Sequence, residues 1–568
     1  MISWSPSYEQ NFEGSDNKHN TSLNINIPVL EGINLKLPSD ILEKTDDIYE
    51  LLLSRLTIDL NKYHNVEENT EYWEYILGLW LNDFIKRYFI IYFSFNDKFE
   101  NVNTIEYIIG YDFKLMNFIP DDYNEYIENI YRENSVWDKF IVQEIAKGEG
   151  VKVVEQAKFN INKKIRKKSN FINYFLMSIS FVLSRIMKKT LFIHRLYVRK
   201  QSLLKIVFLE SSWKTNYFDP RDNFYFKEKT DLEFRNTNTK PTDTEIEKLY
   251  GIIKSLIPRI TLEEYSNSLG VIKIIWPRAV QNIVTSNSHL SNDLFKIYLA
   301  ENSKSSRIHI HQHGGDYGTY AYHPTLKYEL KIADNFYTWG KSLGVEKAIG
   351  LGNLYQMVKR KRKIKKNFRI LLINRDFIWS ERTEFYRYKN FISKFVQALD
   401  DVIKPKLLLR TLKIKLNLRT MKLVSDKRYF NSPFEEYFLG IKKSSRTKDI
   451  VTEAESKILT IVMMSTSTPF IEILGSELPF VLVIDKKICV EYELLSNEFK
   501  QDIEVMIKMG ICFTEPESLA KFLNHNIFRI SEWWDEINRK SEILGIRQKY
   551  SIKTKLNERD FIKIVKNK

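Results

Sequence analysis

Cysteine and long apolar runs are scarce in this chain of 568 residues. Its two cysteines, Cys489 and Cys512, exclude a disulfide framework, and no Cys/His spacing typical of a zinc site occurs. No uninterrupted apolar run reaches the roughly 18 residues that a membrane-spanning helix needs. The first residues are polar and lack the charged-then-apolar layout of a signal peptide. These absences predict a protein of the reducing cytoplasm.

Glycine is also sparse, with 19 residues, and the sequence has neither an internal repeat nor a long low-complexity linker. It does contain 43% hydrophobic and 28% charged residues, which is typical of a packed globular protein of about two to four domains. The 87 Lys and Arg residues exceed the 72 Asp and Glu residues and give a net charge of +15. That surplus is compatible with nucleotides or lipid phosphates as partners. No nucleic-acid-binding fingerprint is present, so nucleic acid is not an expected partner.

The hydrophobic pattern changes along the chain. Apolar residues recur every three or four positions in 40–150, which predicts helices. From about residue 190, short apolar segments alternate with turns and helical segments, and we interpret 202–210 and 271–279 as strands. The same alternation restarts at 369–377. The pattern predicts the α/β class, with two Rossmann-like domains facing a cleft in which a ligand would bind.

The predicted organisation has five parts. A helical segment packs on the first α/β domain, a dense cationic run links the two domains, and a tail follows the second. Their bounds are 1–150 for the N-terminal helical segment, 151–357 for the first Rossmann-like domain, 358–368 for the basic linker, 369–545 for the second Rossmann-like domain and 546–568 for the C-terminal tail.

One segment, 171–187, is apolar and aromatic with basic flanks. Asn173, Ser184 and Arg185 interrupt it. It reads as a core helix with solvated basic flanks, while a helix lying on an anionic membrane surface is the alternative. A contact with the membrane surface is therefore kept as a second expectation.

The stretch HIHQHGGDYG, 309–318, holds three of the nine histidines, and His323 follows. On a strand His309, His311 and His313 would share one face, and the two glycines after them permit a tight turn. A histidine at the carboxyl end of such a strand can transfer protons near neutral pH. The predicted catalytic residues are His313, His311 and Asp316, and the neighbours predicted to line the cleft are Gln312, Gly314 and Gly315.

Three histidines on one strand also raise a metal site as an alternative. Side chains on one face of a strand repeat at roughly 6–7 Å, so two can bind one ion but three seldom converge. No metal ligands and no cofactor are therefore predicted.

A second motif, STSTPFIEIL at 465–474, follows an apolar strand. Its hydroxyl residues open a helix with Pro469 in the first turn, and the free N–H groups of a helix start bind phosphate. Four hydroxyl residues exceed what an N-cap needs. The predicted nucleotide and phosphate ligands here are Ser465, Thr466, Ser467 and Thr468, with Glu472 toward a ribose.

Weaker signals add candidates at other strand ends. Arginines that end strands in a cleft suit phosphate, which gives Arg375 and Arg410. A polar turn into a helix within 283–301 offers further cleft residues, although caps and turns explain the turn about as well. These residues are Asn287, His289, Asn292 and Asp293.

Together these stretches resemble a family of transferases found in bacterial surface-carbohydrate and O-antigen clusters. The matching segments are 60–84, 285–301, 311–318, 465–472 and 532–537. The pairing of QHGG with a later Ser/Thr loop is similar to capsule 3-deoxy-octulosonate (Kdo) transferases and, more distantly, to sialyltransferases and teichoic-acid polymerases. The resemblance implies a GT-B fold with the donor between two Rossmann-like domains, of which 151–357 would be the acceptor-side domain and 369–545 the nucleotide-binding domain. It also implies CMP- or CDP-activated donors in several members and no obligatory metal. It assigns His313 to chemistry and 465–468 to the donor, but His323 with Pro324 is not placed like the sialyltransferase His-Pro motif.

The sequence thus predicts a cytoplasmic glycosyltransferase of cell-surface glycan synthesis. It would move a sugar from a CMP-activated ulosonate or nonulosonate donor to a glycan, lipid-linked or protein acceptor, with a base taking the acceptor proton. Three alternatives stay open. They are a CDP-alcohol phosphotransferase or another nucleotide-sugar enzyme such as an epimerase, a histidine-metal hydrolase, and a membrane-surface scaffold centred on 163–200.

Overall fold

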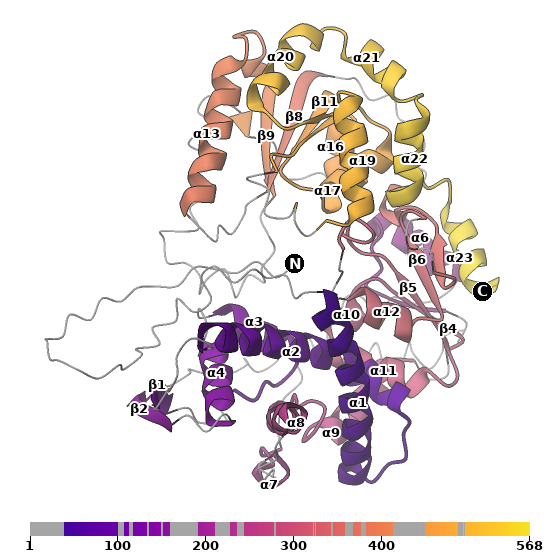
Figure 1. Ribbon diagram of the computed structural model, residues 1–568. Helices are drawn as coiled ribbons and strands as arrows, with labels where there is room; N and C mark the ends of the chain where they lie inside the picture. The colour runs from indigo at the N-terminus through magenta and orange to yellow at the C-terminus, as the bar shows by residue number, and fades with distance from the viewer. Residues whose placement is uncertain are drawn as a thin grey trace, which may run out of the picture.

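The computed structural model places the second parallel α/β domain above the first, with helices of the N-terminal segment beside the lower part of the first domain (Figure 1). The structure describes residues 39–99, 107–112, 118–132, 136–148, 152–158, 191–210, 228–235, 244–357 apart from 278, 279, 322, 324, 342 and 344, 367–375, 382–412, 442–443, and 449–567 apart from 487–491, 493 and 494. The basic linker at 358–366 and the segment 171–187 lie outside the described residues. No helix in the described ranges is both long enough and apolar enough to cross a membrane.

The N-terminal segment is mainly helical. Helices α1 and α2 pack against each other, and α2 also packs on helices α11 and α12 of the first domain, with Trp73 and Trp80 fully buried in the shared core. A short parallel pair, β1 and β2, interrupts the helices that the sequence predicted throughout 40–150. The elements are α1 (Ser39–His64), α2 (Thr70–Phe99), β1 (Tyr107–Asp112), α3 (Tyr123–Arg132), α4 (Val136–Gly148) and β2 (Lys152–Lys158).

The first domain is built on a parallel sheet with described strand order β3-β4-β5-β6-β7. Its strands are β3 (Leu191–His194), β4 (Asn282–Thr285), β5 (Arg307–His311), β6 (Asn335–Thr338) and β7 (Ala348–Gly350). Its helices are α6 (Lys200–Glu210), α7 (Leu232–Arg235), α8 (Glu245–Leu256), α9 (Tyr265–Ile275), α10 (Ser288–Ser291), α11 (Asp293–Asn302), α12 (Leu326–Ile332) and the 3-10 turn η3 (Leu354–Gln356).

Two strand predictions in this domain are wrong. Residues 202–210 form helix α6, and 271–275 form the last turns of α9. Helix α9 buries Tyr265, Ser268, Ile272 and Ile275, a spacing of three and four that a strand would not produce. A short apolar run cannot be assigned to helix or strand by periodicity alone, and the tertiary packing decides.

The second domain has a parallel sheet whose described order is β10-β9-β8-β11-β12-β13. The order reverses between β8 and β11, so the switch point of the sheet lies there. Its elements are β8 (Asn367–Arg375), α13 (Arg382–Ala398), η4 (Lys404–Lys406), β9 (Leu407–Leu412), β10 (Lys442–Lys443), α16 (Ile450–Ala454), β11 (Lys457–Met463), α17 (Thr468–Ser476), β12 (Phe480–Val483), α19 (Asn497–Lys508), β13 (Cys512–Phe513), α20 (Pro516–Asn526), α21 (Ile530–Ile537) and α22 (Ser541–Tyr550).

After α22 of the second domain, the chain returns to the first domain. Residues predicted as a tail, 546–568, hold the end of α22 and then α23 (Glu558–Asn567), which lies beside α6 (Figure 1). Phe561 and Val565 of α23 are fully buried in a cluster with Leu191 and Ile206. The predicted fold class, α/β with two Rossmann-like domains and an added helical segment, is confirmed by the two parallel sheets and the helices around them.

Candidate active site

The two strongest sequence motifs meet where the domains touch. Strand β5 ends at His311 and the Gly314–Gly315 turn follows, while β11 ends at Met463 and α17 begins at Thr468. The backbone N–H of Gly315 donates to the Thr468 hydroxyl at 3.0 Å. A Cβ atom on Gly315 would lie 2.4 Å from the Thr468 backbone nitrogen, so only glycine fits. The carboxyl ends of β5 and β11 therefore face one crevice.

The start of α17 carries hydroxyl groups that make no capping hydrogen bond to the helix. Ser467 occupies the N-cap position, yet its side chain accepts no cap hydrogen bond and instead lies 3.0 Å from the Ser465 hydroxyl. The Thr466 hydroxyl is buried and has no hydrogen-bond partner within the described part of the chain. Such a buried group normally has a partner. The N–H groups of the first helical turn have no carbonyl within the helix to bind, so this end of α17 suits an anion.

Backbone strain marks the same loop. Met464, directly before the hydroxyl residues, has φ 47°, a left-handed conformation that a methionine seldom adopts. Its N–H donates to Val483 O at 2.8 Å, which fastens the start of the loop to the end of β12. Strain of this kind gathers at functional sites, where the surrounding structure enforces it.

His313 is the one predicted catalytic histidine with solvent access. Its side chain is 29% exposed, just past the end of β5, and Nδ1 lies 3.0 Å from the Tyr317 hydroxyl. Partial burial lowers the pKa of the imidazole, against the pull of the Glu329 carboxylate 3.9 Å away. A neutral imidazole in this place can accept a proton. Asp316 lies in the same turn, partly exposed.

His311 and His309 are enclosed in the sheet. His311 is fully buried, Nδ1 lies 2.8 Å from Gln312 O, and burial lowers its pKa to about 4. His309 contacts Asn282 and Tyr337 on the two neighbouring strands. The expected single face of three histidines therefore does not form, because β5 ends before His313. No group of three possible metal-binding side chains is found among the described residues.

Gln312 has a structural role at this corner. Its side-chain oxygen accepts from the Trp339 backbone N–H at 2.8 Å, and its amide donates to Gly314 O at 2.6 Å. The Trp339 indole donates to Gln312 O at 3.1 Å. These bonds fix the strand end from which the glycine turn leaves.

Glu472 joins the domains. It is buried, and it accepts hydrogen bonds from the Tyr197 hydroxyl at 2.8 Å and from the Asn353 amide at 3.3 Å, both in the first domain. Burial raises its pKa to about 7, although these two bonds oppose the rise. Both donors bind Oε1, so this oxygen of the expected ribose ligand is already engaged by protein groups.

The two arginines differ in what the structure assigns to them. Arg410 forms an ion pair with Glu453 of α16, and both side chains are largely buried. This carboxylate competes for the guanidinium that the sequence assigned to phosphate. Arg375 is the last residue of β8, beside the switch point, as predicted for a strand-end residue.

The polar turn at 287–293 is largely structural. Asn292 caps α11 by accepting from Phe295 N at 3.2 Å. Asp293 pairs with Lys296 at 2.7 Å and accepts from Tyr123 N at 2.6 Å, which ties the N-terminal segment to the domain. Asn287 precedes α10 without capping it. His289 is fully buried, and its Nε2 lies 2.8 Å from the carboxylate of Glu329 on α12.

Sequence reasoning missed Glu329 on α12. This carboxylate is fully buried and accepts from the His289 ring at 2.8 Å, the Tyr317 hydroxyl at 2.7 Å and the Thr325 hydroxyl at 3.0 Å. The signal available was an acidic residue six positions after His323, in a helix that follows the histidine stretch. Tyr317, which links Glu329 to His313, lies within the histidine stretch, but no sequence pattern indicates its role.

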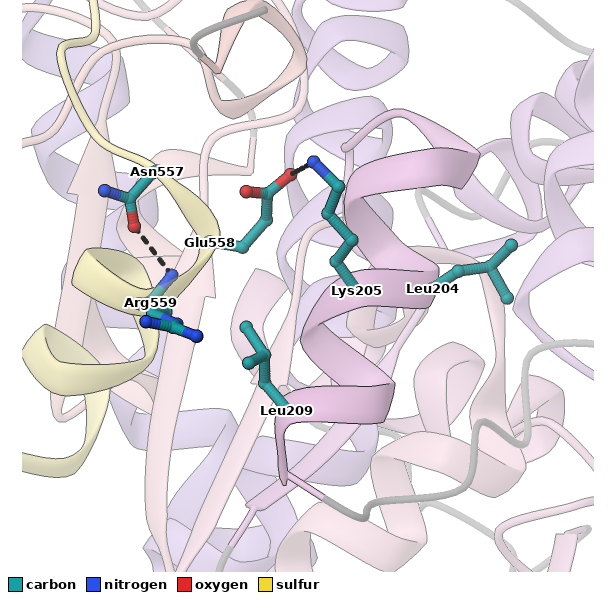
Figure 2. A pocket seen from close by; sticks show the side chains of 6 residues that line it. All are labelled: Leu204, Lys205, Leu209, Asn557, Glu558 and Arg559. Atoms are coloured by element: carbon teal, nitrogen blue, oxygen red, sulfur yellow. Dashed lines mark hydrogen bonds and ion pairs between the residues drawn. The ribbon is translucent and has the colours of Figure 1, made fainter.

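A separate cavity of about 660 Å³ lies between α6 and α23 (Figure 2). Its lining has two leucines and one ion pair, Lys205 with Glu558 at 3.2 Å. Neither the hydroxyl loop nor a histidine lines it. We therefore place the candidate site at the contact between the domains and not in this cavity.

Comparison with known proteins places the chain in a family. Residues 35–564 match the model of the LIC12162 family transferases. The chain belongs to this transferase family. A search of curated proteins finds no match.

Solved structures show remote similarity. S. aureus MnaA with UDP matches at 12% identity and TM-score 0.33, over 67% of this chain and 96% of that protein. Acinetobacter baumannii MurG matches at 10% identity and TM-score 0.31, over 56% and 81%. Thermobaculum terrenum O-GlcNAc transferase matches at 9% identity and TM-score 0.27, over 58% and 59%.

Proposed function

We propose that this transferase is a glycosyltransferase that takes a sugar from a nucleotide donor bound between the two domains. The observation that carries the proposal is the contact of Gly315 with Thr468 at 3.0 Å. It brings a partly exposed histidine and a helix start with spare hydroxyls to one crevice at a topological switch point. The transferase family is consistent with group transfer at this site.

In the proposed reaction, an acceptor hydroxyl oxygen bonds to the anomeric carbon of the donor as the bond from that carbon to the phosphate oxygen breaks. His313 takes the hydroxyl proton, because His311 is enclosed in the sheet whereas His313 is partly exposed beside the glycine turn. The leaving phosphate gains negative charge, which the N–H groups at the start of α17 and the hydroxyls of Thr466 and Ser467 stabilise.

The finer assignment follows the resemblance of the QHGG turn and the Ser/Thr loop to Kdo transferases. It names a CMP-activated ulosonate or nonulosonate donor and a cell-surface glycan, lipid-linked or protein acceptor, with the enzyme in the cytoplasm and in contact with the membrane surface. A CDP-alcohol phosphotransferase would use the same anion site, and product analysis separates the two, since that enzyme transfers an alcohol phosphate with release of CMP and does not transfer a sugar.

Thermal unfolding with nucleotides tests the proposal. We expect one of CMP, CDP, UDP, GDP and dTDP, near 100 times its Kd, to raise Tm by about 5 to 10 °C. Ser467→Ala should weaken that nucleotide about 10- to 100-fold with little change in the unliganded Tm, because Ser467 makes no cap bond. A preference for CMP supports the ulosonate donor. A preference for another nucleotide keeps the glycosyltransferase proposal and discards the ulosonate donor.

The matched control is Asn557→Ala. Asn557 caps α23, far from the crevice, by accepting from Arg559 N at 2.9 Å and Asp560 N at 3.1 Å. This variant should lower the unliganded stability by about 1 kcal/mol and keep the nucleotide shift. No shift with any nucleotide, together with destabilisation by a chelator, would reject the proposal in favour of a metal hydrolase.

A further inference from the structure

A fully buried carboxylate lies behind His313. Glu329 on α12 has two oxygens with different partners: Oε1 faces the His289 ring at 2.8 Å, and Oε2 accepts from the Tyr317 hydroxyl at 2.7 Å. A buried carboxylate stays ionised only where hydrogen bonds satisfy it. Burial raises its pKa, but the bond from His289 and the neighbouring histidines outweigh this, and its pKa lies below the ordinary value. Glu329 is therefore an acceptor and not a donor.

The direction of each hydrogen bond follows from this charge. A tyrosine hydroxyl has one proton, and Tyr317 gives it to Glu329. Its oxygen can then only accept from the second neighbour, Nδ1 of His313 at 3.0 Å. Nδ1 of His313 must carry the ring proton for this contact to be a hydrogen bond. The other ring nitrogen, Nε2, is then the one with a free lone pair.

The surroundings hold this chain of bonds in place. The Tyr317 ring stacks on His323 with centroids 3.9 Å apart, and Tyr317 is almost fully buried. Thr325 donates a second bond to Oε2 of Glu329 at 3.0 Å. His289 occupies Oε1, so Glu329 cannot turn away from Tyr317 without losing a buried partner.

We propose that Tyr317 and Glu329 are positioning residues that hold His313 with its proton on Nδ1 and so present Nε2 to the crevice as the base. The role of the base rests on the proposed function, whereas the tautomer does not. As the proton of the acceptor reaches Nε2, the ring becomes positive, and the Glu329 carboxylate 3.9 Å from Nδ1 stabilises that charge through Tyr317.

Nuclear magnetic resonance of the full chain labelled with ¹³C and ¹⁵N at histidine tests the tautomer without any substrate. The nitrogen and carbon shifts of a neutral ring differ between Nδ1–H and Nε2–H forms. His313→Gln identifies the His313 signals by their absence. We expect the Nδ1–H form in the wild type near pH 7.5, and a shift toward Nε2–H in Tyr317→Phe and in Glu329→Gln.

The chain offers a matched control on β5, the strand that leads to His313. His309 Nδ1 lies 3.1 Å from the Tyr337 hydroxyl, a second buried Tyr–His pair. Tyr337→Phe should change the His309 signals and leave those of His313 unchanged, while Tyr317→Phe should do the reverse. This cross-comparison separates a local hydrogen bond from general loosening of the fold.

The wild-type spectrum alone can overturn the inference, even if a variant fails to fold. An Nε2–H form of His313 in the wild type, or His313 signals that ignore Tyr317→Phe, would reject it. Failure of every nucleotide to bind would reject the proposed function and leave the tautomer result standing, so the two failures are distinguishable. With an active donor, Tyr317→Phe should lower kcat about 10²- to 10⁴-fold with KM little changed.

Discussion

At the scale of single residues, Glu472 connects titration with the contact between the domains. Its raised pKa of about 7 comes first from burial, and Asp449 nearby adds to the rise while Arg199 opposes it. Its hydrogen-bond donors, Tyr197 and Asn353, belong to the other domain. The protonation of this one carboxyl group therefore bears on how tightly the domains hold together.

The pH dependence of Glu472→Gln tests this carboxyl group. The folded chain keeps the proton up to about pH 7, whereas the unfolded chain releases it near 4.5, so the free energy of unfolding falls as the pH rises between these values. An amide stays neutral and can accept both bonds. We expect the Tm of Glu472→Gln, relative to the wild type, to be several degrees higher at pH 8 than at pH 5.

A surface carboxyl group provides the comparison. Glu536 is 75% exposed, and Glu536→Gln should change Tm by the same small amount at both pH values. A relative Tm of Glu472→Gln that is equal at pH 5 and pH 8 would contradict a raised pKa at this position.

Single residues also mark the limit of sequence reasoning at the site. The glycine turn and the hydroxyl loop were predictable, since both have a local signature of glycine or of Ser/Thr before Pro469. Glu329 was not, because a lone glutamate on a helix usually faces solvent and only packing of α12 on the histidine turn buries it. Arg410 was predicted as a phosphate ligand, but it pairs with Glu453. No local pattern indicates this pair, since Glu453 lies on a helix 43 residues away in sequence.

At the scale of elements, the glycine turn and α17 form a steric fit. Gly315→Ala would place a methyl group 2.4 Å from the Thr468 nitrogen, which is backbone and cannot turn aside. We expect the domains to separate locally, with loss of nucleotide binding and a fall in the free energy of unfolding of about 1 to 3 kcal/mol. Nucleotide titration and urea unfolding measure the two effects.

Gly270→Ala is the counterpart in a helix. Gly270 lies in α9, and a Cβ atom there meets nothing within 4 Å. Alanine in that place should stabilise the chain by about 0.4 to 1 kcal/mol. If Gly315→Ala behaved like Gly270→Ala, the close fit of the turn against α17 would be refuted.

The elements themselves were predictable where sequence and packing agree. The sequence predicted an apolar strand followed by a helix that begins at the hydroxyl residues, and these elements form β11 and α17. Residues 202–210 were misassigned, because α6 presents Leu203 and Ile206 to the core and leaves Leu204 exposed, a pattern too short to reveal its period. The contact between α6 and α23 depends on residues about 350 positions apart, which no local pattern encodes.

At the scale of the whole molecule, the last helix completes the first domain. Phe561→Ala removes a fully buried ring from the cluster of β3, α6 and α23, and we expect a loss of about 3 to 5 kcal/mol in the free energy of unfolding. Phe528 is 74% exposed, so Phe528→Ala should cost under about 1 kcal/mol. Urea unfolding measures both. Equal, small losses in the two variants would show that α23 does not support the first domain.

The return of α23 has a consequence for synthesis on the ribosome. Leu191 and Ile206 share this cluster with Phe561 and Val565, which are made about 350 residues later. At about 5 to 20 residues per second, roughly 20 to 70 seconds separate the two ends of this cluster. The first domain must spend that interval with an apolar face uncovered while the second is translated. A nascent chain stalled before residue 558 should therefore be a target for holding chaperones, and a chain stalled after α23 has emerged should not depend on them.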